Sequence, residues 1–242
     1  MEIKARSDIG SVRQTNEDSY LYLIKDDLNF IAFVCDGMGG HLGGSFASKA
    51  TIDVIKETYD ELDLTNENLN VGVWLFETLQ KANTLIYKKT LEDDSLRGMG
   101  TTVTGVIMFN GTIYYAHVGD SRIYTYSKDD IQQITTDHTY VNSLLLNGLI
   151  TYKQALKHPK RHVLTNSLGI KRDVSVDIGR IPLHDGENIL ICTDGLHNML
   201  DKKKMLKILS QSISTEQKVD ELIAKALQVG GTDNITLILL EN

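Results

Sequence analysis

Phe30-Ile31-Ala32-Phe33-Val34-Cys35-Asp36-Gly37-Met38-Gly39-Gly40-His41 joins an uninterrupted apolar run to an acidic residue and a glycine-rich turn. The apolar run predicts a buried strand, and Asp36 follows it directly. After the turn, residues 44–60 place small and apolar side chains at helical spacing, which predicts an amphipathic helix. This stretch therefore predicts a strand–turn–helix unit with a carboxylate at the end of its strand.

Three more acidic residues stand beside apolar, strand-like runs. Asp120 follows residues 113–119, Asp194 follows 189–193, and Asp233 precedes 235–240. Carboxylates at the ends of packed strands are costly to desolvate, and hard divalent cations with oxygen ligands usually neutralise them. A turn aspartate is the simpler interpretation of each residue alone. Together they favour a polynuclear Mg²⁺ or Mn²⁺ site, which is typical of hydrolytic phosphate chemistry.

Length and composition indicate one globular domain, 1–242. The chain has 242 residues, of which 41% are hydrophobic, and a formal net charge of −7. A nucleic-acid partner is not expected without a basic footprint, although solubility alone explains the acidity equally well. No apolar stretch approaches the roughly 20 residues of a membrane span, and the N-terminus lacks a signal-peptide core. We therefore expect a cytoplasmic monomer that does not insert into membranes, in agreement with only two cysteines.

The chain alternates strand pairs with helix pairs. Asn110-Gly111 predicts a hairpin, because both residues of its turn need positive φ, and Ser214 with Gln217 predicts a capping box. Residues 138–170 are polar, and Asn147-Gly148 and His158-Pro159 interrupt their short helix-like pieces. This segment therefore predicts an irregular flap. The pattern favours an α+β fold with mostly antiparallel sheets. Strands are expected at 2–8, 19–24, 30–35, 101–109, 112–119, 121–126, 131–135, 174–181, 188–193 and 235–240, and helices at 44–60, 67–91, about 201–212 and 215–229.

Other side chains are candidates for the same site. Arg13 would grip a phosphate with two parallel hydrogen bonds, unless it is an ordinary surface arginine. Glu17 and Asp18 would hold metal-bound waters, or belong to a solvated loop. His41 is a candidate proton donor, with a structural role as the alternative. The basic cluster of residues 157–162 would steer an acidic phosphopeptide, although a solvated loop is the simpler interpretation.

In order, these motifs resemble the metal-dependent protein phosphatase 2C (PPM) family in its compact bacterial form. The resemblance spans nearly the whole chain. It rests on Ser7-Asp8-Ile9-Gly10, Arg13-Gln14-Thr15-Asn16-Glu17-Asp18, Asp36-Gly37-Met38-Gly39-Gly40-His41, Gly100-Thr101-Thr102, Val118-Gly119-Asp120-Ser121-Arg122-Ile123-Tyr124, Thr136-Asp137-His138, Leu164-Thr165-Asn166-Ser167-Leu168-Gly169, Cys192-Thr193-Asp194-Gly195-Leu196 and Gly231-Thr232-Asp233-Asn234-Ile235-Thr236.

The resemblance implies a four-layer αββα sandwich of two mostly antiparallel sheets flanked by pairs of helices. It implies hydrolysis of phosphoserine and phosphothreonine by attack of a metal-bridging hydroxide. By residue match, Asp36 bridges two Mn²⁺ or Mg²⁺ ions and the Gly37 carbonyl ligates one. Asp194 and Asp233 complete this centre, and Asp120 joins Asp194 at a third, weaker ion.

The resemblance also assigns the surroundings of these ions. Glu17 and Asp18 act through waters, Arg13 binds the phosphate, and residues 138–165 form a flap beside the substrate cleft. Met38 occupies the position where eukaryotic relatives carry a histidine thought to protonate the leaving oxygen, so we hypothesise that a metal-bound water takes that role.

Partners and alternatives follow from the same resemblance. Phosphorylated proteins are the expected substrates, and a cognate membrane-anchored Ser/Thr kinase is a plausible opposing partner. A catalytically idle phosphoprotein-binding module of the same fold is the first alternative, and it is disfavoured because every carried-over ligand is present. Another two-metal enzyme, such as a nuclease, is the second, and the acidic charge disfavours it.

Overall fold

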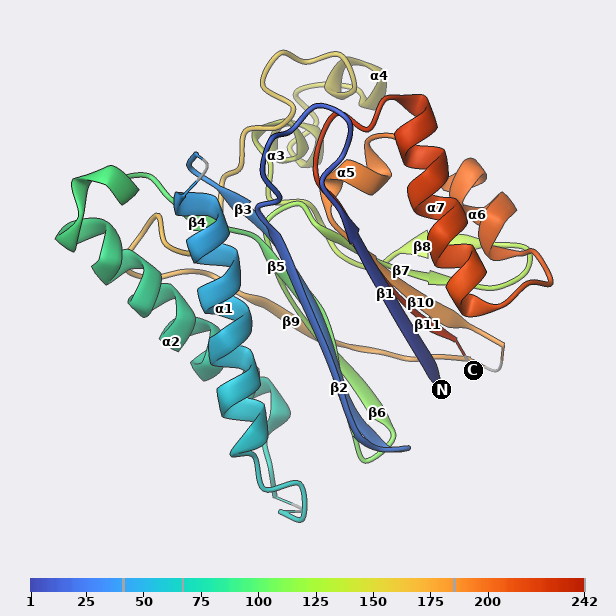
Figure 1. The fold of residues 1–242 in the computed structure, drawn as a ribbon, viewed down its shortest axis with the longest axis horizontal. Helices are drawn as coiled ribbons and strands as arrows, with labels where there is room; N and C mark the ends of the chain where they lie inside the picture. Colours follow the sequence, from blue (N-terminus) through green and yellow to red (C-terminus); the bar gives the residue numbers. More distant parts are fainter. Residues whose placement is uncertain (41, 67, 185, 242) are drawn as a thin grey trace.

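Two antiparallel β-sheets stack face to face in the computed structural model, and helices cover the outer face of each sheet (Figure 1). The structure describes residues 1–40, 42–66, 68–184 and 186–241. This is the predicted α+β sandwich with helices outside, and the fold prediction is confirmed.

The first sheet joins the two ends of the chain. β1 pairs along its whole length with β11, so that Glu2 lies opposite Glu241 and Asp8 opposite Ile235. The strand order is β1-β11-β10-β7-β8, with β1 Glu2–Asp8, β11 Ile235–Glu241, β10 Asn188–Cys192, β7 Arg122–Tyr126 and β8 Ile131–Gln133.

The second sheet is built around β3, the strand of the opening motif. Its order is β2-β3-β5-β6-β9, and the two-residue strand β4 also pairs with β3. The members are β2 Asp18–Asp26, β3 Asn29–Met38, β4 Gly100–Thr101, β5 Val103–Phe109, β6 Thr112–Val118 and β9 Asp177–Ile181. The β5–β6 hairpin turns at Asn110 and Gly111, with φ of 48° and 75°, as predicted.

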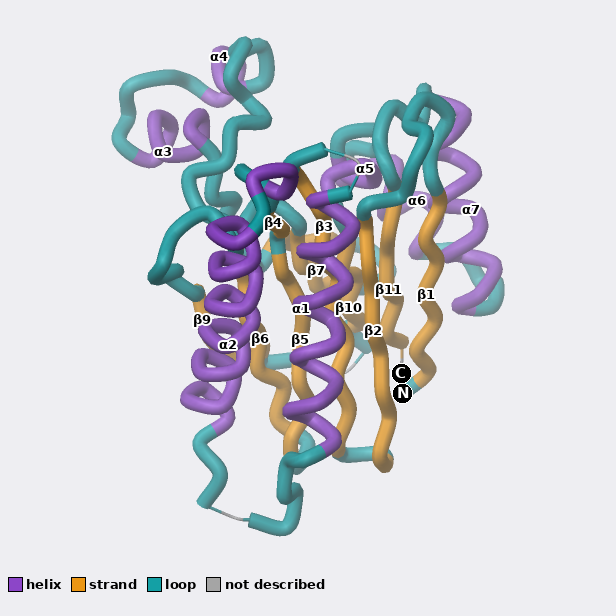
Figure 2. Tube along the Cα trace, turned by 60° about the vertical axis from the view of Figure 1, so that its left-hand side comes forward, coloured by secondary structure: helices purple, strands orange, loops and turns teal. Residues whose placement is uncertain are grey.

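Helices form the two outer layers (Figure 2). α1 (Gly43–Asp60) and α2 (Val71–Glu92) pack on the second sheet, and α5 (Asp194–His197), α6 (Lys202–Leu209) and α7 (Thr215–Val229) pack on the first. The short helices α3 (Tyr140–Leu146) and α4 (Tyr152–Ala155) lie in the flap, and one 3₁₀ turn, η1 (Asp94–Leu96), follows α2. Within the described residues, no helix combines the length and apolarity needed to cross a membrane.

Residues 30–35 of β3 are all apolar because both faces of the strand are buried there. Side chains alternate across a strand, so Ile31, Phe33 and Cys35 pack against α1 and α2, while Phe30, Ala32 and Val34 pack against the other sheet. The uninterrupted run at 30–35 therefore marks the strand that joins two cores.

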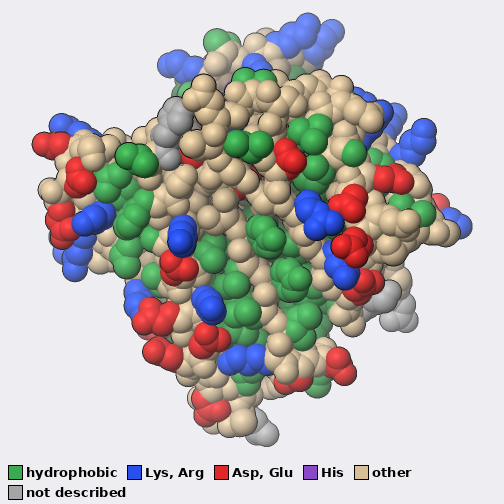
Figure 3. Space-filling view, viewed as in Figure 1, with side chains coloured by type: hydrophobic (Ala, Val, Ile, Leu, Met, Phe, Trp, Pro, Cys, Tyr) green, Lys and Arg blue, Asp and Glu red, His purple; other side chains and the backbone are tan. Residues whose placement is uncertain are grey.

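One edge of the sandwich stays partly open. The edge strands β1 and β2 lie side by side there (Figures 1 and 2), and β2 leaves Tyr20, Tyr22 and Ile24 exposed by 39%, 37% and 54%. Figure 3 shows the hydrophobic side chains that gather over this region. These residues alternate with Leu21 and Leu23, which pack under α1.

Several predicted boundaries were wrong at the ends of elements. The helix expected at 67–91 begins at Val71, because Asn70 caps it by accepting a hydrogen bond from the Val73 backbone N–H at 3.2 Å; residue 67 itself lies outside the described residues. The strand expected from 174 begins at Asp177, and the helix expected to reach 212 ends at Leu209. The capping box of Ser214 and Gln217 is confirmed.

Candidate metal centre

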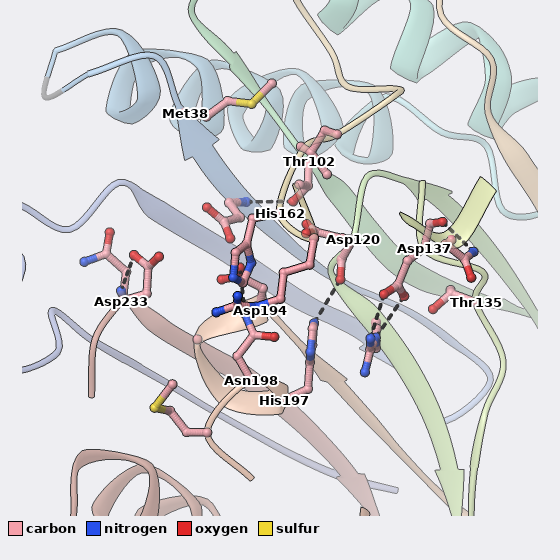
Figure 4. A pocket seen from close by; sticks show the side chains of 18 of the residues that line it. Met38, Thr102, Asp120, Thr135, Asp137, His162, Asp194, His197, Asn198 and Asp233 are labelled. Carbon is pink, nitrogen blue, oxygen red and sulfur yellow. Dashed lines mark hydrogen bonds and ion pairs between the residues drawn. The ribbon is translucent and has the colours of Figure 1, made fainter. Parts of the chain in front are cut away.

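Four strand-end carboxylates meet at one end of the sandwich. Asp36 lies at the end of β3, Asp120 in the turn between β6 and β7, Asp194 after β10, and Asp233 before β11. All four line a single cavity of about 1920 Å³, together with Arg13, Glu17 and the backbone of Gly37. Figure 4 shows Asp120 and Asp194 reaching into this cavity, with Asp233 on one side and Asp137 on the other. The structure thus brings together the acidic residues that the sequence singled out.

Asp36 is fixed through its backbone. The Thr102 N–H and the Thr101 hydroxyl both donate to the Asp36 carbonyl at 2.9 Å, and the Asp36 N–H donates to the Thr102 hydroxyl at 3.0 Å. These bonds explain the Gly100-Thr101-Thr102 motif, because the threonines take up the Asp36 backbone polar groups and leave its carboxylate facing the cavity.

Gly37 lies where no side chain fits. A Cβ there would overlap the Gly44 backbone and come within 2.6 Å of the Glu17 carbonyl oxygen. A Cβ on Gly44 would in turn overlap the Glu17 carboxylate. The β3–α1 turn and the Glu17 loop therefore pack backbone to backbone, which holds the Gly37 peptide beside the Asp36 carboxylate.

Asp18 lies behind the cavity wall, opposite Asp36 in the β2–β3 register. Its Oδ2 accepts a hydrogen bond from the Thr193 hydroxyl at 2.9 Å, whereas its Oδ1 is buried with no hydrogen-bond partner in the described structure. Burial raises the Asp18 pKa to about 7, and the nearby carboxylates of Asp194 and Asp233 add to the rise.

Asp194 also has a buried carboxylate oxygen without a hydrogen-bond partner in the described structure. Its Oδ2 accepts a hydrogen bond from the Asn198 side chain at 3.0 Å, and its Oδ1 is buried with no such partner among the described residues. Burial, followed by repulsion from Asp233, raises its pKa to about 6. Burial likewise raises the pKa of Asp36 and of Asp120 well above the ordinary value, with other carboxylates adding to the rise.

These observations fit a cation. Carboxylates with buried, unpartnered oxygens are stabilised in their charged form by a nearby positive charge, and hard divalent cations take oxygen ligands of this kind. In the described parts of the chain, however, no group of three His, Cys, Asp or Glu side chains is arranged to hold an ion. The Asp233 Oδ2 accepts a hydrogen bond from Arg13 Nη2 at 2.7 Å, so Arg13 would have to release this oxygen for a cation to take it.

Asn234 holds the Arg13 loop against the centre. Its Oδ1 accepts a hydrogen bond from the Glu17 N–H at 2.8 Å, and its Nδ2 donates to the carbonyls of Ile9 and Thr15 at 2.9 and 3.0 Å. One buried amide directly before β11 thereby fixes three points of the segment that carries Arg13 and Glu17. The sequence showed Asn234 only as the neighbour of Asp233.

Two histidines at the site were not assigned by the sequence. His197 Nε2 donates to the Asp120 carbonyl at 3.0 Å, which ties α5 to the β6–β7 turn, and burial lowers its pKa to about 3. His162 of the flap reaches toward the acidic cluster (Figure 4). Burial, followed by the charge of Arg161, lowers its pKa, and Asp233 opposes this shift. The sequence placed His162 only in a basic cluster, and of residues 157–162 the cavity wall contains only Arg161 and His162. His41, the candidate proton donor, lies outside the described residues.

Arg122 and Asp137 form a partly buried ion pair beside Asp120. Arg122 donates to both carboxylate oxygens, Nε to Oδ1 at 2.8 Å and Nη2 to Oδ2 at 2.6 Å. The pair lowers the Asp137 pKa against the opposing effect of burial. Both residues lie in motifs that the sequence analysis named. The two motifs lie at the two ends of the expected hairpin of residues 121–126 and 131–135, and this placement could have predicted that the two side chains meet.

The chain is similar to known proteins over its full length. A family model described as "Protein phosphatase 2C" matches residues 10–228. The serine/threonine phosphatase stp of Listeria innocua is 35% identical over 241 residues, covering 100% of this chain and 96% of that protein. The protein phosphatase PhpP of Streptococcus pneumoniae is 33% identical over 242 residues, and the match covers 99% of this chain and 97% of that protein.

A solved structure agrees with these sequence matches. The S. agalactiae serine/threonine phosphatase superimposes with a TM-score of 0.93 at 32% sequence identity, covering 99% of this chain and 98% of that one. The similarity therefore includes the flap as well as the two sheets.

Proposed function

Because this chain belongs to the protein phosphatase 2C family, we propose that it is a metal-dependent protein serine/threonine phosphatase, which hydrolyses phosphoserine and phosphothreonine in phosphoproteins. The observation that carries this proposal is the cluster of Asp18, Asp36, Asp120 and Asp194, with its two buried unpartnered oxygens and raised pKa values. Such a cluster is costly without cations, and the family depends on Mn²⁺ or Mg²⁺.

We assign two principal ions to Asp36, the Gly37 carbonyl, Asp194 and Asp233. A third, weaker ion belongs to Asp120 and Asp194, and Glu17 and Asp18 act on the ions through waters. Bound there, the cations would activate a water for attack on phosphorus and offset charge on the phosphoryl oxygens. Support for this ligand set comes from the shared cavity and from the Asp194 Oδ1, which has no hydrogen-bond partner among the residues that the structure describes.

Arg13 orients the substrate. Its guanidinium is exposed at the cavity and presents parallel N–H groups that match two oxygens of a phosphoryl group. Holding the phosphoryl group in line with the attacking water lowers the barrier mainly through position and electrostatics. Asn234 contributes by fixing the loop that carries Arg13.

Residues 1–242 form one catalytic domain with a flap at about 138–165, and the enzyme works as a monomer in the cytoplasm opposite a Ser/Thr kinase. Support for a reducing compartment comes from Cys35 and Cys192, which are both buried and free. Nothing in the structure or its relatives favours the alternative of an idle phosphoprotein-binding module.

The test is hydrolysis of p-nitrophenyl phosphate and of a phosphothreonine peptide, each with Mn²⁺, with EDTA and with the Asp36→Asn variant. The proposal expects metal-dependent turnover of both substrates that EDTA and the variant abolish. No turnover from folded wild-type protein under any metal would reject the catalytic function and favour the idle module.

A further inference from the structure

A run of three lysines stands on the wall of the reaction cavity. Lys202, Lys203 and Lys204 form the first turn of α6 and are exposed, and all three line the same cavity as Asp36 and Asp194. Asp201 caps α6 by accepting a hydrogen bond from the Lys204 N–H at 2.9 Å.

Their charges are uncompensated. Two other cations of the cavity are paired, Arg13 with Asp233 and Arg122 with Asp137. In the described part of the chain, none of the three lysine ammonium groups forms an ion pair, and Lys202 only lies over the Tyr124 ring at 5.9 Å from its centroid. Three positive charges therefore stand together on the α6 part of the cavity wall, with Asp201 as the adjacent carboxylate, in a chain with net charge −7.

The flap supplies another part of the same wall. Leu146, Tyr152 and Leu156 line the cavity with exposures of 71%, 68% and 57%. Figure 3 shows further Lys and Arg side chains at the top of the molecule, over the flap. A polypeptide that brings its phosphorylated residue to the acidic centre would therefore pass between apolar flap side chains and the lysines of α6.

We infer that Lys202, Lys203 and Lys204 select substrates whose phosphorylated residue is flanked by Asp or Glu. The inference rests on the proposed function and names its substrate class. Opposite charges across an interface mainly steer encounter and set specificity. Asp or Glu residues that pass beside the lysines of α6 gain this attraction, whereas neutral residues in the same positions gain nothing.

The test compares phosphothreonine peptides that carry three Glu or three Gln residues, placed before or after the phosphothreonine. The variant combines Lys202→Ala, Lys203→Ala and Lys204→Ala. A matched control combines Lys128→Ala, Lys207→Ala and Lys225→Ala, which removes the same charge from exposed positions outside the cavity wall. Each protein serves as its own reference, because the readout is the ratio of kcat/KM for the Glu and the Gln peptide that carry the three residues on the same side.

Wild type is expected to prefer the Glu peptide by about tenfold, mainly through KM, since exposed pairs each contribute little and act before chemistry. The lysine variant should lose this preference and the control should keep it. About 0.5 M salt should shrink the preference in wild type by screening. A lysine variant that keeps the preference, or a wild type without one, overturns the inference.

Turnover of p-nitrophenyl phosphate distinguishes a failure of the inference about the lysines from a failure of the proposed phosphatase function. If wild type hydrolyses it with Mn²⁺ but does not distinguish the peptides, only the inference about the lysines fails. If wild type hydrolyses neither p-nitrophenyl phosphate nor peptide, the proposed function fails and the inference fails with it.

Discussion

Arg13 Nη2 donates a hydrogen bond to Asp233 Oδ2 at 2.7 Å, so the proposed phosphate ligand and a proposed metal ligand engage each other directly. The same contact raises the Arg13 pKa. A carboxylate oxygen that accepts from a guanidinium is less available to a cation. Arg13 is therefore expected to favour phosphate binding while it competes with metal binding.

We predict opposite effects of Arg13→Ala on turnover and on metal affinity. Loss of a charge-matched phosphate contact should lower kcat on a phosphopeptide about 10²-fold. Release of Asp233 should tighten Mn²⁺ binding, by up to about fivefold because the pair is exposed. Calorimetric titration with Mn²⁺ measures the second effect. Arg6→Ala, which removes an arginine that pairs with Asp220, is the control. Weaker Mn²⁺ binding in Arg13→Ala would contradict this competition.

The metal-free protein should lose stability as the pH rises. The Asp18 pKa of about 7 lies above the usual 3.8. Between these values the folded state holds a proton that the unfolded state has released, so the free energy of unfolding falls with increasing pH. The loss is complete above the folded-state pKa.

Asp18→Asn tests this link, because it removes the titrating group. In EDTA, the drop in Tm from about pH 5 to about pH 7.5 should be smaller in the variant than in wild type. Asp94→Asn, at an exposed position, should follow wild type. Equal drops in Asp18→Asn and wild type would show that Asp18 is not the source of the pH dependence.

Asn234→Ala should loosen the loop that carries Arg13 and Glu17. The change leaves the Glu17 N–H and the carbonyls of Ile9 and Thr15 without their partner. A buried group left unpaired costs about 1–3 kcal/mol. Because these three groups are only partly buried, thermal unfolding should report a total loss of about that size. Turnover should fall with it, because Arg13 is no longer positioned. Asn147→Ala, which removes an exposed bond to the Ser143 carbonyl, should change neither. An unaltered Tm in Asn234→Ala would show that Asn234 does not stabilise the loop that carries Arg13 and Glu17.

The strand-end carboxylates were predictable because local sequence carries their signal. An apolar run followed by Asp and Gly marks a buried strand and its end, and the structure places Asp36, Asp120, Asp194 and Asp233 around one cavity as expected. Asn110-Gly111 fixed its hairpin for the same reason, since the turn geometry depends only on the two residues themselves.

Contacts between distant segments were not predictable in this way. Asn234 and Glu17 are 217 residues apart, and neither local sequence pattern predicts a contact with the other residue. His162 looked like part of a solvated basic cluster because its approach to the centre depends on how the flap folds back. Short elements such as α5 were missed because one helical turn has no periodicity to read.

Gly37→Ala should disrupt both the fold and the metal centre. The added Cβ meets backbone atoms of Gly44 and Glu17, which cannot move as a flexible side chain would. Overpacking of this kind costs about 1–3 kcal/mol and sometimes more. Any relief must shift the Gly37 peptide, so Mn²⁺ binding measured by calorimetry should weaken even at temperatures where the variant stays folded.

Gly72→Ala is the matched control for that experiment. Its Cβ would lie in α2 at ordinary contact distance, 3.5 Å from Asn70 Oδ1 and 3.8 Å from a methyl group of Ile178. Alanine in place of a helical glycine should raise the free energy of unfolding by up to about 1 kcal/mol and leave Mn²⁺ binding unchanged. The two variants add the same methyl group, so the difference between them isolates the backbone junction at Gly37. If Gly37→Ala folds and binds Mn²⁺ as well as Gly72→Ala does, the Gly37 carbonyl is not a ligand held in place by that junction.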